Sequence, residues 1–436
     1  MNTESTLQNQ NKKDPVVERR YLVPFILITS LFALWGFAND ITNPMVAAFK
    51  TVMEISNAKA ALVQFAFYGG YATMAIPAAL FVQKYSYKKG ILLGLALYAF
   101  GALMFWPAAQ FEMFGFFLIS LYVLTFGLAF LETTANPFIL SLGSQKTATQ
   151  RLNLAQAFNP IGSLLGMFVA SQIILSSLAS DKRDAAGNLI FTTLDETAKA
   201  AIRTEDLMII RNPYVALGLV VIIMFVVIAC TKMPQTGHAE KVEPLKSAKR
   251  LLANVTYREG VIAQLFYVAA QIMCWTFIIQ YAGNLGINKA DAQLYNIVAM
   301  GMFLVSRFIC TFLMRFLDSR KLLLICAVGG MACMAVTIFV GGMTGLYALV
   351  ATSGFMSLMF PTIYGLALER VGNDATLGAA GLVMAIIGGA LMPPMQGAII
   401  DMGTVAGLDA ENASFVLPFL CFIVVATFAK RTLKAA

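Results

Sequence analysis

The segment Phe32–Val46, FALWGFANDITNPMV, combines two properties that rarely occur together in one stretch of chain. It lies inside an apolar run from about residue 21 to residue 49, which is long enough to cross a bilayer as a helix. Its centre nevertheless carries four polar side chains and a proline: Asn39, Asp40, Thr42, Asn43 and Pro44. Amides and a carboxylate in hydrocarbon cost several kcal/mol unless they face protein or water. The segment therefore predicts a membrane helix with one face turned away from lipid.

The rest of the chain has the same apolar character. Of its 436 residues, 59% are hydrophobic and 12% are charged, whereas a soluble protein is about 25% charged. This composition predicts an all-α integral membrane protein that crosses the bilayer many times. The net charge of +8 comes from Lys and Arg in short segments between the apolar runs, as a membrane topology requires. It gives no support to nucleic-acid binding.

Twelve windows of the chain are long and apolar enough to cross a bilayer. They lie near residues 21–49, 58–82, 88–107, 113–141, 150–177, 211–232, 255–283, 291–314, 321–341, 345–368, 375–400 and 412–430. If the windows alternate across the membrane, most of the 31 Lys and Arg residues fall on one side. The positive-inside rule then predicts cytoplasmic termini and an outer loop over residues 178–211. The polar first twenty residues show no cleaved signal peptide.

A polar segment from about residue 231 to residue 257 divides the windows into six and six. The halves resemble each other, since segments 81–105 and 312–339 both place a basic loop before a helix rich in small residues. Two similar six-helix bundles imply a pseudo-twofold axis along the membrane normal and a substrate site between them near mid-membrane. The predicted parts are a cytoplasmic tail 1–20, a first bundle 21–232, a cytoplasmic linker 233–254, a second bundle 255–430 and a tail 431–436.

Several predicted spans carry polar side chains at helical spacing. Glu132 and Asn136 share a face of the fourth span, and two further sets occupy the fifth and seventh: Asn153, Gln156 and Asn159, and Gln264, Tyr267, Gln271 and Trp275. Hydrogen bonds between helices, worth about 0.6 kcal/mol each, would explain the amides. They do not explain Asp40 and Glu132, because buried carboxylates without basic neighbours are costly and usually functional.

Other conspicuous residues are expected to be structural. Arg307, in the eighth span, should extend along its helix to the cytoplasmic surface, as long basic side chains do near helix ends. Trp106 should lie at a membrane interface. Six prolines are expected to interrupt helices and allow bends: Pro44, Pro137, Pro160, Pro361, Pro393 and Pro394. The six cysteines lie in apolar segments without metal or disulfide spacing.

Amides, carboxylates and tryptophans together suit a sugar. Sugar hydroxyls both donate and accept, so Asn and Gln pair with them, and a carboxylate accepts from two at once. The apolar faces of a pyranose pack on aromatic rings, for which Trp35 and Trp275 are placed. The only histidine, His238, lies in a polar linker, and no catalytic or nucleotide-binding motif occurs. We therefore expect no enzyme, no metal site and no cofactor, and any proton carrier within the membrane must be a carboxylate.

Five segments resemble the fucose–proton symporter family of the major facilitator superfamily. They are NDITNP (39–44), LETTANPF (131–138), RLNLAQAFN (151–159), AQLFYVAAQIMCW (263–275) and FMSLMFPTIYGLALERVG (355–372). The resemblance extends from about residue 21 to residue 430. It implies twelve helices in the major facilitator fold, rocking of the two bundles, and uptake of a monosaccharide with a cation. It also implies that Glu132 takes part in coupling and sugar binding, and that Trp35, Gln156 and Trp275 line the sugar site.

One position departs from that family pattern. The family's second acidic residue stands eight positions after the tryptophan of the first span, where this chain has Asn43. The acid of this chain is Asp40, three residues earlier on the same helix face, where the pattern has Asn. Asp40 could replace the displaced proton carrier, complete a cation site with neighbouring amides, or bind sugar hydroxyls. We favour the first of these roles.

The predicted function is import of a monosaccharide, in the first place L-fucose, in symport with a proton across the bacterial cytoplasmic membrane. Glu132 and Asp40 are the expected coupling carboxylates. The expected sugar-binding residues are Trp35, Asn39, Asp40, Asn43, Gln64, Glu132, Asn136, Gln156, Asn159, Tyr267, Gln271, Trp275 and Phe360. Sugar and membrane lipid are the expected partners of a monomeric chain. A sodium-coupled or passive hexose transporter is the alternative, and a drug exporter is less favoured.

Overall fold

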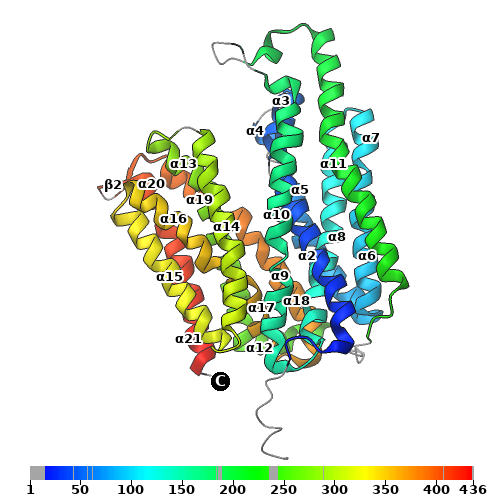
Figure 1. Ribbon diagram of the computed structural model, residues 1–436, viewed down its shortest axis with the longest axis vertical. Helices are drawn as coiled ribbons and strands as arrows, with labels where there is room; N and C mark the ends of the chain where they lie inside the picture. Colours follow the sequence, from blue (N-terminus) through cyan, green and yellow to red (C-terminus); the bar gives the residue numbers. More distant parts are fainter. Residues whose placement is uncertain are drawn as a thin grey trace, which may run out of the picture.

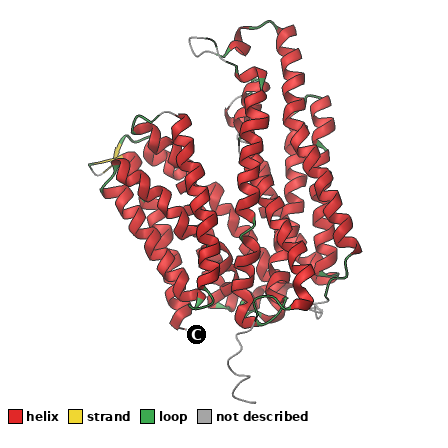
Figure 2. Ribbon diagram, in the orientation of Figure 1, coloured by secondary structure: helices red, strands yellow, loops and turns green. Residues whose placement is uncertain are grey.

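The computed structural model describes residues 15–42, 44–55, 57–60, 62–182, 184, 189–234, 244–287, 289–405 and 407–434. Twelve helical segments within this part are long and apolar enough to cross a membrane, which confirms the predicted number of spans. Helices make up almost all of the described chain (Figure 2). The only strands found there are β1 (Thr404–Val405) and β2 (Leu408–Asp409), which form one antiparallel pair.

The twelve spans are built from single helices or from two shorter helices in succession. The first six spans contain α2 (Leu22–Thr42), α3 (Met45–Val52), α4 (Asn57–Ala60), α5 (Leu62–Lys84), α6 (Tyr87–Leu103), α7 (Phe105–Gln110), α8 (Phe114–Ser141), α9 (Ala148–Gln156), α10 (Asn159–Phe168) and α11 (Glu196–Cys230). After α12 (Pro244–Ala253), the last six contain α13 (Val255–Asn284), α14 (Lys289–Leu313), α15 (Ser319–Phe339), α16 (Gly342–Met356), α17 (Met359–Leu368), α18 (Ala375–Met384), α19 (Gly388–Ile400), α20 (Ala410–Ser414) and α21 (Val416–Lys434). Short helical turns complete them: η1 (Arg19–Tyr21), η2 (Gln145–Thr147), η3 (Val169–Ile174), η4 (Leu175–Ser177), η5 (Ala179–Asp181), η6 (Ile190–Thr193), η7 (Gly372–Asp374) and η8 (Ala385–Ile387).

The helices form two bundles that meet at one end and diverge at the other (Figure 1). At the bottom of Figure 1, where α2 begins and α21 ends, α18 packs against α5 and α8, and α17 packs against α9. The apolar core of the first bundle continues there into the second bundle through Tyr364, Leu382 and Val383. A separate core fills the rest of the second bundle. The two halves are thus joined at the end that carries both termini.

Only some of the prolines interrupt helices. Pro44 lies between α2 and α3, Pro160 is at the start of α10, and Pro361 is in the first turn of α17. Pro137, Pro393 and Pro394 lie inside α8 and α19, which continue through them, so the expected interruptions at these three positions are wrong. A proline removes one main-chain donor and adds a steric clash, and a helix can absorb both by bending.

The sixth span begins earlier than its hydropathy predicts. α11 has 35 residues and starts at Glu196, where the carboxylate of Asp195 accepts from the main-chain N–H of Ala198 at 2.9 Å and caps the helix. At about 1.5 Å per residue, α11 is far longer than the roughly 30 Å hydrocarbon core. Part of the expected loop 178–211 is therefore helix that continues beyond the membrane.

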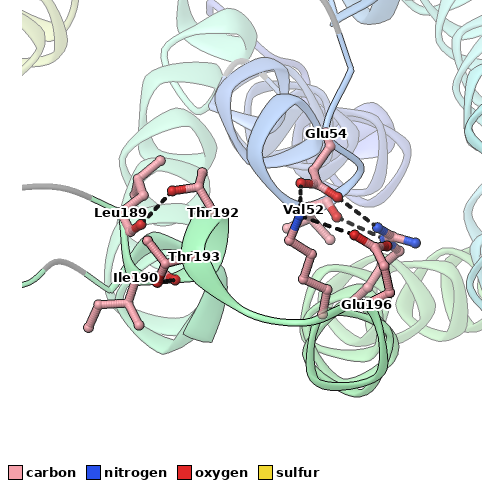
Figure 3. Close-up of polar contacts among 9 residues, drawn as sticks. Val52, Glu54, Leu189, Ile190, Thr192, Thr193 and Glu196 are labelled. Carbon is pink, nitrogen blue, oxygen red and sulfur yellow. Dashed lines mark hydrogen bonds and ion pairs between the residues drawn. The ribbon is translucent and has the colours of Figure 1, made fainter.

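This extension of α11 is tied to the end of α3. Figure 3 shows Glu54 beside the start of α11, where its carboxylate accepts from Lys199 Nζ at 2.8 Å and from Arg203 Nη2 at 3.1 Å. Arg203 Nε also donates to the carbonyl oxygen of Val52 at 3.2 Å. The first and sixth spans are therefore connected outside the membrane at the end where the bundles diverge.

Candidate functional site

A cavity of about 140 Å³ lies between the two bundles. The first bundle lines it mainly with polar groups: Asn39, Asp40, Tyr68, Tyr71, Glu132, Gln156, Asn159 and Ser163, together with Phe32, Trp35 and Pro160. The second bundle lines it mainly with apolar groups: Val268, Ile272, Trp275, Met300, Phe303, Phe360 and Ile386, together with Gln271 and Arg307. A ligand in this cavity meets hydrogen-bonding groups on one side and aromatic surface on the other. A sugar has both kinds of surface.

Most of the predicted sugar-binding residues lie in this lining. They are Trp35, Asn39, Asp40, Glu132, Gln156, Asn159, Gln271, Trp275 and Phe360. Asn136 and Tyr267 do not belong to it. Asn43 lies outside the described residues, as does the side chain of Gln64, so the roles expected of them stay predictions.

Close contact between α2 and α10 holds several of these groups in place. A Cβ atom on Gly36 would lie 2.1 Å from the carbonyl oxygen of Asn159, and one on Gly162 would lie 1.7 Å from a carbonyl oxygen of α2. Only glycine lets two helix backbones approach so closely. Asn159 Nδ2 also donates to the carbonyl oxygen of Phe32 at 3.2 Å. The spacing between Trp35 and Asn159 is thus set by main-chain contact.

Two buried polar atoms of the lining have no hydrogen-bond partner within the described chain. They are Oε2 of Glu132, an acceptor when the carboxylate is ionised, and Nε1 of Trp35, which can only donate. More than about 90% of buried polar groups in folded proteins are paired, so such atoms call for an explanation. An unpaired acceptor and an unpaired donor on two residues that line one cavity are suited to a hydroxyl-bearing ligand. Protonation of Glu132 would remove its charge and turn one oxygen into a donor.

Asn136 lies behind the lining and positions two residues of it. Its Nδ2 donates to the carbonyl oxygen of Glu132 at 3.0 Å, within α8. Its Oδ1 accepts from Nε2 of Gln156 at 2.8 Å, which connects α8 to α9. Asn136 therefore positions Glu132 and Gln156 from behind the lining, and its expected contact with sugar stays a prediction.

The two tryptophans of the cavity are held by aromatic neighbours. The rings of Trp35 and Phe32 lie 4.6 Å apart, and those of Trp275 and Phe303 lie 5.1 Å apart in an edge-to-face arrangement. Trp275 Nε1 donates to the hydroxyl oxygen of Ser353 at 3.1 Å. The indole donor of Trp275 is thus paired within the protein, whereas that of Trp35 is unpaired within the described chain.

Asp40 shares the polar wall of the cavity with Glu132 and lies close enough to Tyr68 for an electrostatic interaction. Tyr68 and Tyr71, both absent from the predicted set, enter the lining from α5. Their spacing of three residues, in a span with polar groups on one face, is the sequence signal that could have identified them. The displaced acid of this chain thus remains at the site.

Arg307 does not extend to a membrane surface. It is 3% exposed, and its guanidinium lies 4.6 Å above the centre of the Phe303 ring. Its Nε donates to the carbonyl oxygen of Ser357, and its Nη1 donates to that of Gln156 at 2.9 Å. The expectation that Arg307 reaches the cytoplasmic surface is wrong, because main-chain acceptors inside the protein replace water for this side chain.

The polar stripe predicted on the seventh span divides between two environments. Gln271 and Trp275 line the cavity, whereas Gln264 and Tyr267 are fully buried elsewhere. The Tyr267 hydroxyl donates at 3.0 Å to the carbonyl oxygen of Met356, the last residue of α16. Tyr267 therefore caps a helix end and lies outside the lining, and its expected sugar contact stays a prediction. The stripe covers more than three helical turns, and the cavity reaches only the later ones.

Hydrogen bonds between the halves close the cavity toward the end that carries the termini. Asn153 Nδ2 donates to the Thr362 hydroxyl at 3.1 Å, and Gln150 Nε2 donates to the carbonyl oxygen of Thr311 at 2.9 Å. The hydroxyls of Tyr87 and Thr376 lie 3.0 Å apart. The bundles diverge at the opposite end (Figure 1).

Known proteins resemble this chain over nearly its whole length. The family model of the Major Facilitator Superfamily matches residues 26–393. The L-fucose-proton symporter of Haemophilus influenzae is 63% identical over 96% of this chain and 98% of its own. The L-fucose-proton symporter of Escherichia coli is 35% identical over 96% and 95%, and a glucose/galactose transporter of Brucella abortus is 30% identical over 94% of both chains.

Solved structures of transporters also resemble this chain over nearly its whole length. A crystal structure of the major facilitator transporter FucP in the outward conformation matches with a TM-score of 0.86 and 34% identity, over 95% of this chain and 99% of that one. A proton:xylose symporter matches with a TM-score of 0.69 at 14% identity, which shows a common fold only. The relatives are transporters and not enzymes. The chain is a multi-pass membrane protein, and it belongs to the fucose–proton symporter family of the major facilitator superfamily.

Proposed function

We propose that this protein imports L-fucose together with a proton by alternating access across the bacterial cytoplasmic membrane. The observation that carries the proposal is that Glu132, with an unpaired acceptor, and Trp35, with an unpaired donor, line one cavity between the halves. Family membership, and the name L-fucose-proton symporter given to relatives at 63% and 35% identity, support the choice of substrate.

Sugar binding uses the two kinds of wall. Hydroxyl groups pair with Glu132, Gln156 and Asn159 on the first bundle, and Trp35 donates to a sugar oxygen. The apolar face of the ring, with its methyl group, packs on Trp275 and Phe360 of the second bundle. A sugar that contacts both bundles stabilises the arrangement in which the bundles lie closer together. Binding thereby promotes closure over the ligand.

The proposed direction of transport follows from the charge distribution and the shape. The positive-inside rule places both termini, and the linker between the bundles, in the cytoplasm. The bundles are hydrogen-bonded at the terminal end and diverge at the other. The structure then corresponds to an outward-facing state, ready to take sugar from outside. We propose a monomer, since each chain carries both halves of one site.

Coupling is assigned to Glu132. A charged carboxylate that faces the moving interface opposes occlusion, because occlusion removes its access to water. Protonation from outside cancels that cost, and release to the cytoplasm resets the carrier. One charge that moves through 100 mV supplies about 2.3 kcal/mol, which supports roughly fifty-fold accumulation. Asp40, on the same wall, is proposed as the carrier that replaces the family's displaced acid.

Uptake by purified protein in liposomes tests the proposal. An inward pH gradient should drive concentration of labelled L-fucose, and an inward sodium gradient at equal pH should not. Unlabelled L-fucose should compete more strongly than D-glucose, D-galactose or D-xylose. Concentration driven by sodium alone would replace the proton by sodium. Stronger competition by D-glucose or D-galactose would replace the substrate, as the similarity to glucose/galactose transporters allows.

A further inference from the structure

Arg307 joins the two halves through main-chain oxygens and not through a carboxylate. It is buried in α14, in the second bundle, and none of the ion pairs between described residues includes it. Its Nη1 donates to the carbonyl oxygen of Gln156, the last residue of α9 in the first bundle. Its Nε donates to the carbonyl oxygen of Ser357, between α16 and α17 of its own bundle. A cation buried in this way is costly and calls for a function.

Both acceptors have lost their helical donor to a proline. In an α-helix the carbonyl of residue i accepts from the N–H of residue i+4. For Gln156 that residue is Pro160, and for Ser357 it is Pro361, and neither has an N–H. Each carbonyl would remain unpaired inside the membrane, where no water replaces the missing donor. One guanidinium, with donors in a fixed fork, supplies both.

Rocking of the two bundles affects the two hydrogen bonds of Arg307 differently. The bond to Ser357 lies within the second bundle, so it persists when the bundles rock. The bond to Gln156 crosses between the bundles, as does the Gln150–Thr311 contact that also joins α9 to α14. Opening of the end that carries the termini must break both crossing bonds. The free Gln156 carbonyl then needs another donor or water.

We propose that Arg307 is a latch of the outward-facing state, and that Pro160 creates the carbonyl on which it acts. Gln156 belongs both to the latch, through its main-chain carbonyl, and to the proposed sugar site, because it lines the cavity. Its side chain also donates to Asn136, which in turn donates to the carbonyl oxygen of Glu132. Displacement of Gln156 by a ligand therefore acts directly on the latch. This inference rests on the proposed function only in assuming that the two bundles alternate.

Opening of the closed end can be measured without sugar or proton. In a cysteine-free background, Thr376→Cys places a thiol at the contact with Tyr87, where it is buried while that end is closed. The rate of its reaction with a permeant maleimide reports opening. Arg307→Met should raise this rate about ten-fold or more, the size expected for loss of a hydrogen bond from a charged donor. Arg307→Lys, which lacks the fork but keeps the charge, should raise it as well.

The decisive comparison adds Pro160→Ala, which returns a main-chain N–H to the Gln156 carbonyl. In that background Arg307→Met should raise the rate less than about three-fold, because the carbonyl no longer depends on the guanidinium. Pro361→Ala is the matched control: it returns a donor to Ser357, within one bundle, so the full effect of Arg307→Met should persist there.

Equal effects of Arg307→Met in the presence and in the absence of Pro160→Ala would overturn the latch. Absence of L-fucose uptake by the parent protein would instead overturn the proposed function and leave the labelling result intact. Variants are compared after each elutes as a single symmetric peak in detergent.

Discussion

Replacement of Glu132 by glutamine should separate proton coupling from sugar binding. Glutamine has nearly the same volume and keeps one acceptor oxygen, but it cannot carry a proton across the membrane. The Asn136 bond at this position goes to the main-chain oxygen of residue 132, so it survives the substitution. Asn136 therefore still orients Gln156 at 2.8 Å. The sugar site should stay assembled while its coupling group is lost.

The expected size of the effect follows from the work done by the coupled charge. One proton that moves through 100 mV supplies about 2.3 kcal/mol, or roughly fifty-fold accumulation at equilibrium. Because the proposed coupling needs Glu132 as well as Asp40, the ratio of internal to external L-fucose should fall to about one in Glu132→Gln. Binding of L-fucose should weaken by about ten-fold at most, since one hydrogen bond in an intact cavity is replaced by a weaker one.

Two assays in the same liposomes separate these quantities. Exchange of labelled against unlabelled L-fucose at equal pH measures sugar movement without net proton flow, and Glu132→Gln should retain it. Uptake under an inward pH gradient of fixed size measures coupling, and the variant should reach no concentration ratio above one. Glu132→Asp is the control that keeps a carboxylate. Concentrative uptake by Glu132→Gln at the parent level would refute the reasoning, because the unpaired oxygen would then serve the sugar alone.

Three further outcomes follow from the site and the charge distribution. Trp275→Ala should weaken L-fucose binding at least about five-fold in titrations of the purified protein, through lost ring contact, while Trp275→Phe should recover part of it; an unchanged dissociation constant would assign Trp275 to packing. Asp40→Asn should keep exchange and lose pH-driven uptake, and addition of Asn43→Asp should restore that uptake; full accumulation by the single variant would leave Asp40 a sugar-binding role. In intact cells, an impermeant maleimide should label Thr193→Cys and spare Lys249→Cys, and the reverse pattern would invert the proposed topology.

The parts of this structure that the sequence predicts best are those governed by local periodicity. Twelve apolar runs correspond to twelve membrane helices because length and hydropathy determine a span without knowledge of its neighbours. Glu132, Gln156 and Trp275 could be placed at the cavity for a similar reason, since polar side chains at helical spacing in lipid must turn inward. The early start of α11 is not predicted, because hydropathy contains no information about a helix that continues into water.

Contacts between residues that lie far apart in the sequence cannot be predicted from local sequence patterns. The sequence favours a surface position for Arg307 because its acceptors, Gln156 and Ser357, belong to other helices and carry no side-chain signal. It favours sugar contact for Tyr267 because helical spacing alone does not show how deep a cavity extends. A proline in a helical segment indicates that the carbonyl four residues before it lacks its usual main-chain donor. The sequence does not indicate which other group donates to that carbonyl.

The glycine contact between α2 and α10 also restricts how substrate preference can change in this family. A side chain at Gly36 or Gly162 would have to push two backbones apart, and the whole polar wall would move with them. Mutations there should abolish transport of every sugar alike. A new preference must instead arise by exchange of side chains such as Asn39 or Gln271 on unchanged helices. Relatives that transport different hexoses should therefore superimpose closely along these two helices and differ only in the groups they present to the sugar.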